Sequence, residues 1–218
     1  MVPAAGYALR LQPLQCSKEM LVVGGRPVMD YLVERMRTAG ADEIRVVTRP
    51  EKADVIANAE HLGAVVIRSR PATVDASFAA GLHGLAPDDI VLLGFPDSIW
   101  EPVDGYRRLV EVVERGGEVA LGMFESPGLE GSDYLVLDDE GRIADIDIKP
   151  ARPRSDWIWG AAAARARALE GIEQLEWPSL HMLALRERGL ELHGVPLSAS
   201  YLDIGTPSSL DKLPAFLG

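Results

Sequence analysis

Two basic residues follow a run of small residues near the start of the chain, and the combination is typical of phosphate binding. The run is Ala4-Ala5-Gly6, and the cations are Arg10 and Lys18. Small side chains let backbone N–H groups approach phosphate oxygens, and glycine tolerates dihedral angles that other residues avoid. The two cations would add the charge that backbone dipoles alone do not supply. A nucleotide is the leading hypothesis, and solvated loop charges are the alternative.

A single aspartate follows a strongly apolar run later in the chain. Residues 90–93 are typical of a strand buried on both faces, and Gly94-Phe95-Pro96-Asp97 comes directly after them. Ligands of open α/β sheets gather just beyond the carboxyl ends of the strands, so Asp97 is a candidate for chemistry. Taken alone, a turn or helix-capping aspartate is an equally weighted alternative.

The charge balance limits the partners that such a site could serve. The chain has 218 residues, with 22 Lys and Arg against 33 Asp and Glu and a net charge of −11. This balance opposes binding along a nucleic-acid backbone, so no nucleic-acid partner is expected. A small polyphosphate stays compatible if a few cations converge in one cleft and a divalent cation offsets the remaining charge. We therefore expect the flagged basic residues to cluster in space.

Composition also indicates a soluble, cytoplasmic protein. Hydrophobic residues make up 47% of the chain, enough for one buried core, and the single cysteine, Cys16, allows no internal disulfide. No apolar stretch approaches the roughly 18–20 residues that a membrane helix needs. The N-terminus lacks a basic region followed by an apolar one, as a signal peptide would have. No membrane partner is expected.

Apolar runs alternate with helical patterns in the way that an α/β fold requires. One helix is expected to begin near Pro27 and to stop at Gly40. The other expected elements are strands at 44–47, 64–67, 90–93, 119–123, 191–195 and 201–204, helices at 51–62, 73–85, 105–114 and 172–188, and a hairpin of 134–137 with 142–148. No linker divides the sequence, so residues 1–218 are predicted to form one domain.

Five ordered motifs resemble the sugar-1-phosphate nucleotidyltransferases, particularly the glucose-1-phosphate thymidylyltransferases and uridylyltransferases. The family opens with Ala-Gly-Gly-x-Gly-Thr-Arg-Leu-x-Pro-Leu, then Pro-Lys-x-Met-Leu and Gly-x-(Lys/Arg)-Pro. It continues with Gly-Asp at a strand end, Glu-Lys-Pro with a following sugar-side strand, and a late Asp-x-Gly-Thr. This chain has Gly6-Tyr-Ala-Leu-Arg10-Leu-Gln-Pro-Leu, Ser17-Lys-Glu-Met-Leu21 with Gly25-Arg-Pro27, Gly94-Phe-Pro-Asp97, Lys149-Pro150 followed by Trp159-Gly160-Ala161, and Tyr201-Leu-Asp-Ile-Gly-Thr-Pro207. Five matches in the same order are far more specific than any single match.

The resemblance implies a fold and a reaction. The fold is a single-domain, Rossmann-like α/β fold, with a mixed, mostly parallel sheet, helices on both faces and an inserted β-hairpin. About residues 1–125 would bind the nucleotide, and about residues 126–218 the sugar phosphate. A sugar-1-phosphate oxygen would attack the α-phosphorus of a nucleoside triphosphate, with dTTP or UTP favoured, and pyrophosphate would leave. Relatives often assemble, so a homo-oligomer stays open.

The resemblance also assigns roles to individual residues. Asp97 and Asp203 match the ligands of Mg2+, which prefers carboxylate and phosphate oxygens. Arg10 would contact the β- and γ-phosphates, Lys18 would bridge the α-phosphate and the sugar phosphate, and Lys149 would hold the sugar phosphate. The remaining matches are Ala4, Ala5, Gly6 and Thr73 on the nucleotide side, and Gly160 on the sugar side. Without the ordered motifs, Lys149 would be the exposed end of a hairpin strand.

Departures from the family pattern leave alternatives open. Ala8 replaces the second glycine, Leu9 replaces a Thr or Ser, and Ile148 stands where the family has a glutamate that binds sugar hydroxyls. The base and the sugar are therefore open. One alternative is a nucleotide-binding or nucleotide-sugar-binding module that has lost catalysis. Another is a transferase for a different phosphorylated acceptor, such as an alditol phosphate, an aminoalkyl phosphate or a heptose phosphate.

Overall fold

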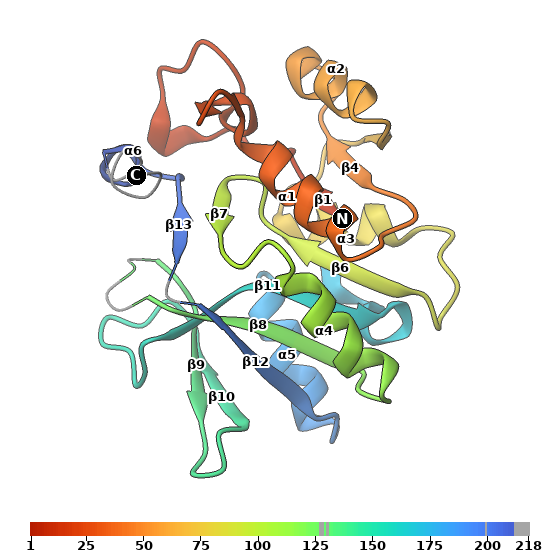
Figure 1. Cartoon of the computed structure of the whole chain (residues 1–218), viewed down its shortest axis with the longest axis vertical. Helices are drawn as coiled ribbons and strands as arrows, with labels where there is room; N and C mark the ends of the chain where they lie inside the picture. Colours follow the sequence, from red (N-terminus) through yellow and green to blue (C-terminus); the bar gives the residue numbers. More distant parts are fainter. Residues whose placement is uncertain (127–128, 130, 199, 212–218) are drawn as a thin grey trace.

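Three short strands pair in parallel at the N-terminal end of the fold, in the order β1-β4-β5. The computed structural model describes residues 1–126, 129, 131–198 and 200–211 (Figure 1). The strands are β1 (Val2–Pro3), β4 (Arg45–Thr48) and β5 (Val65–Arg68). Helices α1 (Val28–Thr38) and α2 (Ala53–His61) connect them, as parallel neighbours require.

A larger, mixed sheet lies beside the three-stranded sheet, and the two together form the central layer of the fold. Its order is β10-β9-β11-β8-β12, with β6 also paired to β11. Strands β6 and β8 each run antiparallel to β11, and β12 runs parallel to β8, so β6, β8 and β12 share one direction. The members are β6 (Ile90–Gly94), β8 (Val119–Glu125), β9 (Tyr134–Leu137), β10 (Ile143–Asp147), β11 (Trp157–Arg165) and β12 (Leu192–Ser198). The mixed α/β fold with an inserted hairpin is confirmed.

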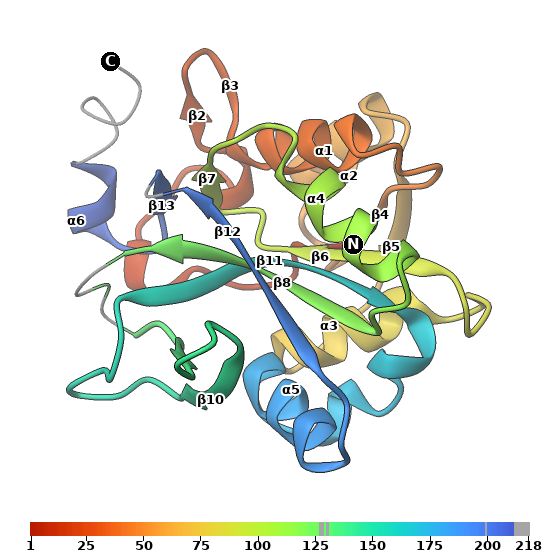
Figure 2. The same ribbon diagram turned by 60° about the horizontal axis from the view of Figure 1, so that its bottom comes forward.

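Helices cover both faces of this layer. In Figure 2, α1 and α4 (Gly105–Glu114) lie on one side of the sheet, and α3 (Val74–Leu82) and α5 (Pro178–Glu187) lie on the other. Strand β8 shows why both faces must be covered, because its alternate side chains enter two different cores. Phe124 packs in the core beneath α1 and α4, whereas Leu121 and Met123 pack in the core beneath α3 and α5.

A small antiparallel pair joins the end of the chain to the middle of the fold. Strand β7 (Ser98–Trp100) pairs with β13 (Tyr201–Asp203), so that Asp203 lies opposite Ser98. The remaining elements are β2 (Val22–Val23), β3 (Arg26–Pro27), a short α6 (Pro207–Leu210), and 3-10 turns at Leu9–Leu11, Lys18–Met20, Ala166–Leu169 and Ile172–Gln174. Over the described residues, no helix is both long and apolar enough to cross a membrane.

The expected helix at 172–188 is wrong in its first part. A 3-10 turn at Ile172–Gln174 comes first, and α5 begins only at Pro178. Proline has no N–H and its ring clashes with the preceding turn, so it belongs at the first position of a helix rather than in its interior. The other expected helices are present, and Gly40, with a φ of 85°, follows the end of α1.

Candidate active site

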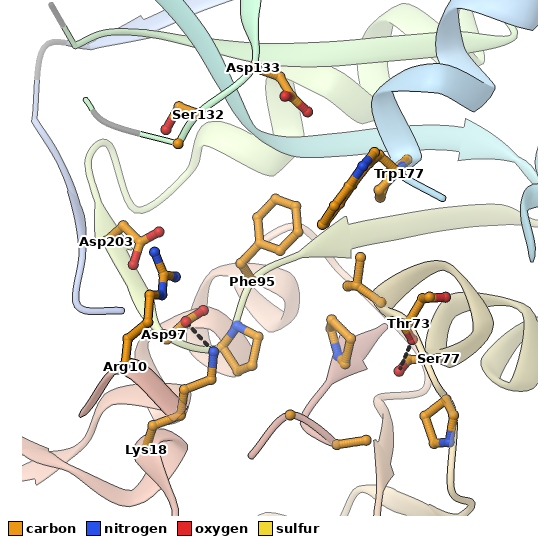
Figure 3. Close-up of a pocket in the computed structure, with 18 of the residues that line it drawn as sticks. Arg10, Lys18, Thr73, Ser77, Phe95, Asp97, Ser132, Asp133, Trp177 and Asp203 are labelled. Atoms are coloured by element: carbon orange, nitrogen blue, oxygen red, sulfur yellow. Dashed lines mark hydrogen bonds and ion pairs between the residues drawn. The ribbon is translucent and has the colours of Figure 1, made fainter. Parts of the chain in front are cut away.

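A cleft of about 470 Å³ opens beside the ends of β1, β4 and β6. Figure 3 shows Arg10, Lys18, Asp97 and Asp203 gathered on one side of it, and Thr73 and Ser77 on the other. The lining includes eight of the residues that the sequence pointed to: Ala5, Gly6, Arg10, Lys18, Thr73, Asp97, Lys149 and Asp203. Residues that are far apart in the sequence therefore share one cavity, and the expected clustering of cations is present.

The small-residue loop after β1 forms one wall of the cleft. Ala4 is fully buried behind this wall, and its N–H donates to the Val47 carbonyl at 2.8 Å, so the structure does not bring it into the lining. Ala8 adopts the left-handed conformation (φ 53°, ψ 43°), which costs glycine little and alanine about 1 kcal/mol. The 3-10 turn that follows carries Arg10, whose side chain points toward Asp203 (Figure 3).

Lys18 and Asp97 form an ion pair at the bottom of the cleft. Asp97 lies between β6 and β7, and its side chain is 12% exposed, against 20% for that of Lys18. Burial alone would lower the pKa of Lys18, but the adjacent Asp97 carboxylate outweighs it, so the pKa is raised. Lys18 is thus firmly cationic at neutral pH.

Asp203 meets Asp97 because β13 pairs with β7. The Ile204 N–H donates to the Asp97 carbonyl at 2.8 Å, and the Gly205 N–H donates to the Asp203 carboxylate at 2.5 Å. Burial, followed by the charge of Asp97, raises the pKa of Asp203 to about 6. Two carboxylates that repel each other in this way can share a divalent cation, which favours oxygen ligands. No third Asp, Glu, His or Cys joins them among the described residues.

Lys149 approaches the cleft from the end of β10. Its φ is 44°, its N–H donates to Asp133 Oδ1 at 3.1 Å, and its ammonium lies 2.8 Å from the centre of the Trp177 ring. Burial lowers the pKa of Lys149, Asp133 opposes the change, and the positive charge of Arg10 adds to it. Asp133 in turn accepts from Ser179 Oγ at 2.5 Å. This network places one cation on the side of the cleft that Phe95, Trp159 and Trp177 line, here called the aromatic side.

Gly160 supports the site from behind rather than lining it. A Cβ at this position would lie 2.2 Å from the Tyr201 ring, so only glycine lets β13 pack closely against β11. Tyr201 is two residues before Asp203 in the same strand. Gly160 therefore helps to place β13, the strand that carries the Asp203 carboxylate.

Sequence reasoning missed Arg49 and Asp133. Arg49 Nε donates to the Ala5 carbonyl at 2.8 Å, and its Nη2 donates to the Pro71 carbonyl at 2.9 Å, which links two walls of the cleft. Arg49 comes directly after β4, and the rule that singled out Asp97 at a strand end applies to it equally. Asp133 had no such local signal, because its partners are distant in sequence.

Asp75 is a buried carboxylate close to the cleft that the site does not use. It lies in the first turn of α3, is fully buried, and neither of its oxygens has a hydrogen-bond partner among the described residues. Burial raises its pKa from 3.8 to about 6, and the nearby N–H of its own backbone, followed by the charge of Lys149, offsets only part of this change. Above pH 6 the folded protein must therefore hold an unpaired buried charge.

Asp75→Asn is expected to stabilise the protein at pH 7.5 by about 1–3 kcal/mol, because it removes that charge. The unfolded carboxyl titrates near pH 3.8 and the folded one near pH 6, so the free-energy cost of the buried charge grows between these pH values. The stabilisation by Asp75→Asn should therefore vanish near pH 4. Denaturant unfolding at pH 4 and pH 7.5 measures it. Asp139→Asn, at an exposed turn position, is the control. An equal gain at both pH values contradicts the explanation.

Comparison with known proteins gives a consistent result. The MobA-like NTP transferase domain family matches residues 1–176. The chain is 23% identical over 235 residues to glucose-1-phosphate thymidylyltransferase of Neisseria meningitidis, covering 100% of this chain and 81% of the relative. It is 27% identical over 223 residues to the enzyme of the same name from an Actinoplanes species, covering 93% and 72%.

Solved structures share the fold. UDP-glucose pyrophosphorylase from Acinetobacter baumannii superposes with a TM-score of 0.79 at 17% identity, covering 97% of this chain and 90% of that one. A Bacillus anthracis protein solved with sucrose, and provisionally assigned as a glucose-1-phosphate thymidylyltransferase, gives a TM-score of 0.86 at 18% identity, covering 98% and 92%. Together with the ordered motifs and the cleft, these matches place the chain in the MobA-like NTP transferase domain family, among the sugar-1-phosphate nucleotidyltransferases.

Proposed function

We propose that this protein joins a nucleoside triphosphate, dTTP or UTP, to a sugar-1-phosphate. The sugar-phosphate oxygen forms a bond to the α-phosphorus, the bond between the α- and β-phosphates breaks, and pyrophosphate leaves. The observation that carries the proposal is the meeting of Asp97, directly before β7, with Asp203 at the end of its partner strand β13, beside Lys18 and Arg10. Two carboxylates with two cations suit a polyphosphate with one divalent ion better than they suit a neutral ligand.

Each charged side chain has a proposed role in holding the two anions together. Arg10 pairs with the β- and γ-phosphates as they become pyrophosphate, and Lys18 lies between the α-phosphate and the sugar phosphate. Lys149 holds the sugar phosphate from the aromatic side. Asp97 and Asp203 would hold Mg2+, which when bound stabilises charge on the phosphate oxygens. The nucleotide then lies against about residues 1–125 and the acceptor against about residues 126–218.

One observation on the acceptor side favours an acceptor other than glucose-1-phosphate. Ile148 packs against the core beneath α3 and α5, and the cleft lining does not include it. The apolar side chain of Ile148 has no oxygen that could accept a hydrogen bond from a sugar hydroxyl. A different phosphorylated acceptor is therefore the second candidate, and a binding module without catalysis, argued from Ala8 and Leu9, is the third.

Pyrophosphate release tests the proposal across a matrix of triphosphates and phosphorylated acceptors with Mg2+. The acceptors should include glucose-1-phosphate, other sugar-1-phosphates, an alditol phosphate and an aminoalkyl phosphate. Turnover with a sugar-1-phosphate supports the proposal, and turnover only with another acceptor supports the second candidate. Calorimetry separates the remaining outcomes, because binding of a nucleotide without any turnover indicates the module. A folded protein with neither binding nor turnover excludes all three.

A further inference from the structure

Three successive carbonyl groups of the loop after β1 are held by side chains from one neighbouring segment. Lys52 Nζ donates to the Ala4 carbonyl at 2.8 Å and to the Gly6 carbonyl at 3.1 Å. Arg49 Nε donates to the Ala5 carbonyl between them at 2.8 Å. Both cations lie in the short connection between β4 and α2. Charged donors on backbone carbonyls make strong hydrogen bonds, so side chains of this one segment fix the backbone of the loop.

These carbonyls determine where the loop's N–H groups point. In a planar trans peptide the C=O and N–H bonds point in opposite directions, so the carbonyls of Ala4, Ala5 and Gly6 orient the N–H groups of the residues that follow them. Those N–H groups belong to Ala5, Gly6 and Tyr7, all of which line the cleft. None of the three has a hydrogen-bond acceptor among the described residues. Successive N–H groups without a protein acceptor, along the wall of a cleft, are suited to bind an anion.

The two cations are themselves anchored. Lys52 also pairs with Glu19 Oε2 at 2.6 Å, and the Glu19 side chain is fully buried. Arg49 reaches the Pro71 carbonyl at 2.9 Å, and its guanidinium lies 4.3 Å from the centre of the Tyr7 ring. Each cation thus has several fixed contacts, and neither is a mobile surface charge.

We propose that Arg49 and Lys52 are positioning residues that turn the N–H groups of Ala5, Gly6 and Tyr7 toward the phosphates of the nucleotide. This inference rests on the proposed function for the identity of the ligand. It explains how a loop with Ala8 in a left-handed conformation, in place of glycine, keeps its shape. The loop does not depend on its own flexibility, because side chains from β4–α2 hold its backbone.

Calorimetry of sodium tripolyphosphate with Mg2+ tests the proposal without requiring turnover. Arg49→Met is expected to weaken tripolyphosphate binding at least about 10-fold, because the loop N–H groups lose their orientation. Arg49→Lys should weaken it similarly, since a single ammonium on a shorter, unbranched chain does not span the Ala5 and Pro71 carbonyls. Recovery of wild-type affinity in Arg49→Lys would mean that Arg49 acts by charge alone, and it would overturn the proposal.

Arg45→Met is the matched control. Arg45 lies on β4 and also donates to two backbone carbonyls, those of Gly81 and His83 at 2.7 and 2.9 Å, but it does not line the cleft. It should lose comparable stability while tripolyphosphate affinity stays within about 2-fold of wild type. A second measurement separates positioning from general damage. In Arg49→Met, binding of glucose-1-phosphate should change far less than binding of tripolyphosphate, whereas equal losses contradict the proposal.

Lys52 needs a paired variant, because Lys52→Met alone would leave the buried Glu19 carboxylate unpaired and could unfold the protein. Lys52→Met with Glu19→Gln should reduce tripolyphosphate affinity in the same direction as Arg49→Met. Protection of the Gly6 and Tyr7 amide protons by tripolyphosphate, followed by NMR, reports on the loop directly. The protection should be present in the wild type and lost in the variants.

The outcomes separate this inference from the proposed function. A wild-type protein that binds tripolyphosphate through Arg49, yet turns over no substrate pair, retains the inference and loses the proposed enzyme. Turnover that is unaffected in Arg49→Met retains the enzyme and overturns the inference. A wild-type protein that does not bind tripolyphosphate overturns the inference outright.

Discussion

Asp97→Asn is expected to lower turnover by at least about 100-fold in the pyrophosphate-release assay, as when a preorganised charged group is removed from a reacting centre. The amide keeps the shape of the carboxylate and an oxygen that can accept from Lys18, so the backbone between β6 and β7 should hold its place. What the variant loses is negative charge beside Asp203. Steady-state kinetics at saturating triphosphate and acceptor measure the effect.

Asp104→Asn is the control for this variant, because Asp104 precedes α4 and pairs on the surface with Arg108 at 3.6 Å. Its turnover should match the wild type, since exposed pairs contribute little and this one is outside the cleft. Asp203→Asn should resemble Asp97→Asn, because the proposed function gives the two carboxylates the same role. Near-normal turnover in Asp97→Asn would remove this aspartate from the site.

Periodicity was sufficient for most of the fold. Apolar runs such as residues 90–93 and 119–123 became β6 and β8, and their two apolar faces already required helices on both sides. The helix before Gly40 was marked by its own start and stop signals. These features are local, so a single sequence contains them. The true start of α5 also has a local signal, because Pro178 suits the first position of a helix.

Other parts of the fold depend on contacts that no local pattern carries. Strand β11 lies at the centre of the larger sheet, yet its run of alanines between Trp159 and Arg165 is equally compatible with a helix. Only the resemblance to a family pointed to a strand there. The pairing of β7 with β13 joins residues about a hundred positions apart, and it is this pairing that brings Asp203 to Asp97.

The site likewise has residues that a local pattern predicts and residues that depend on contacts distant in sequence. Charge types and strand ends pointed to Arg10, Lys18 and Asp97, because a phosphate ligand and a sheet edge impose general requirements. Asp133 could not be found in this way, since its role depends on Ser179 from α5 and on the Lys149 backbone. The chain is strongly acidic as a whole, yet its cleft collects Arg10, Lys18, Arg49 and Lys149. The net charge of the whole chain therefore argues against a polymer partner, but it does not predict the charge of the cleft.

Lys18→Met should lower turnover by about 100- to 1000-fold, because in the proposed function Lys18 is the cation that stabilises charge on the transferring phosphate. In the wild type Lys18 also neutralises Asp97, so without it two adjacent carboxylates repel each other more strongly. The methionine keeps the apolar stem of the side chain, which limits the packing change. Kinetics and a thermal melt of the same preparation separate lost chemistry from lost stability.

Combining Lys18→Met with Asp97→Asn tests whether the two residues act as one unit. Groups that stabilise the same transition state give losses that do not multiply when both are removed. The double variant should therefore be no more than about 10-fold slower than the slower single variant. Fully multiplicative losses would mean that the ion pair of the free protein is incidental, with Lys18 and Asp97 contacting different parts of the substrate. If turnover of Lys18→Met stays within about 3-fold of wild type, Lys18 is not part of the reacting centre, because loss of a charge-stabilising group lowers turnover far more than this.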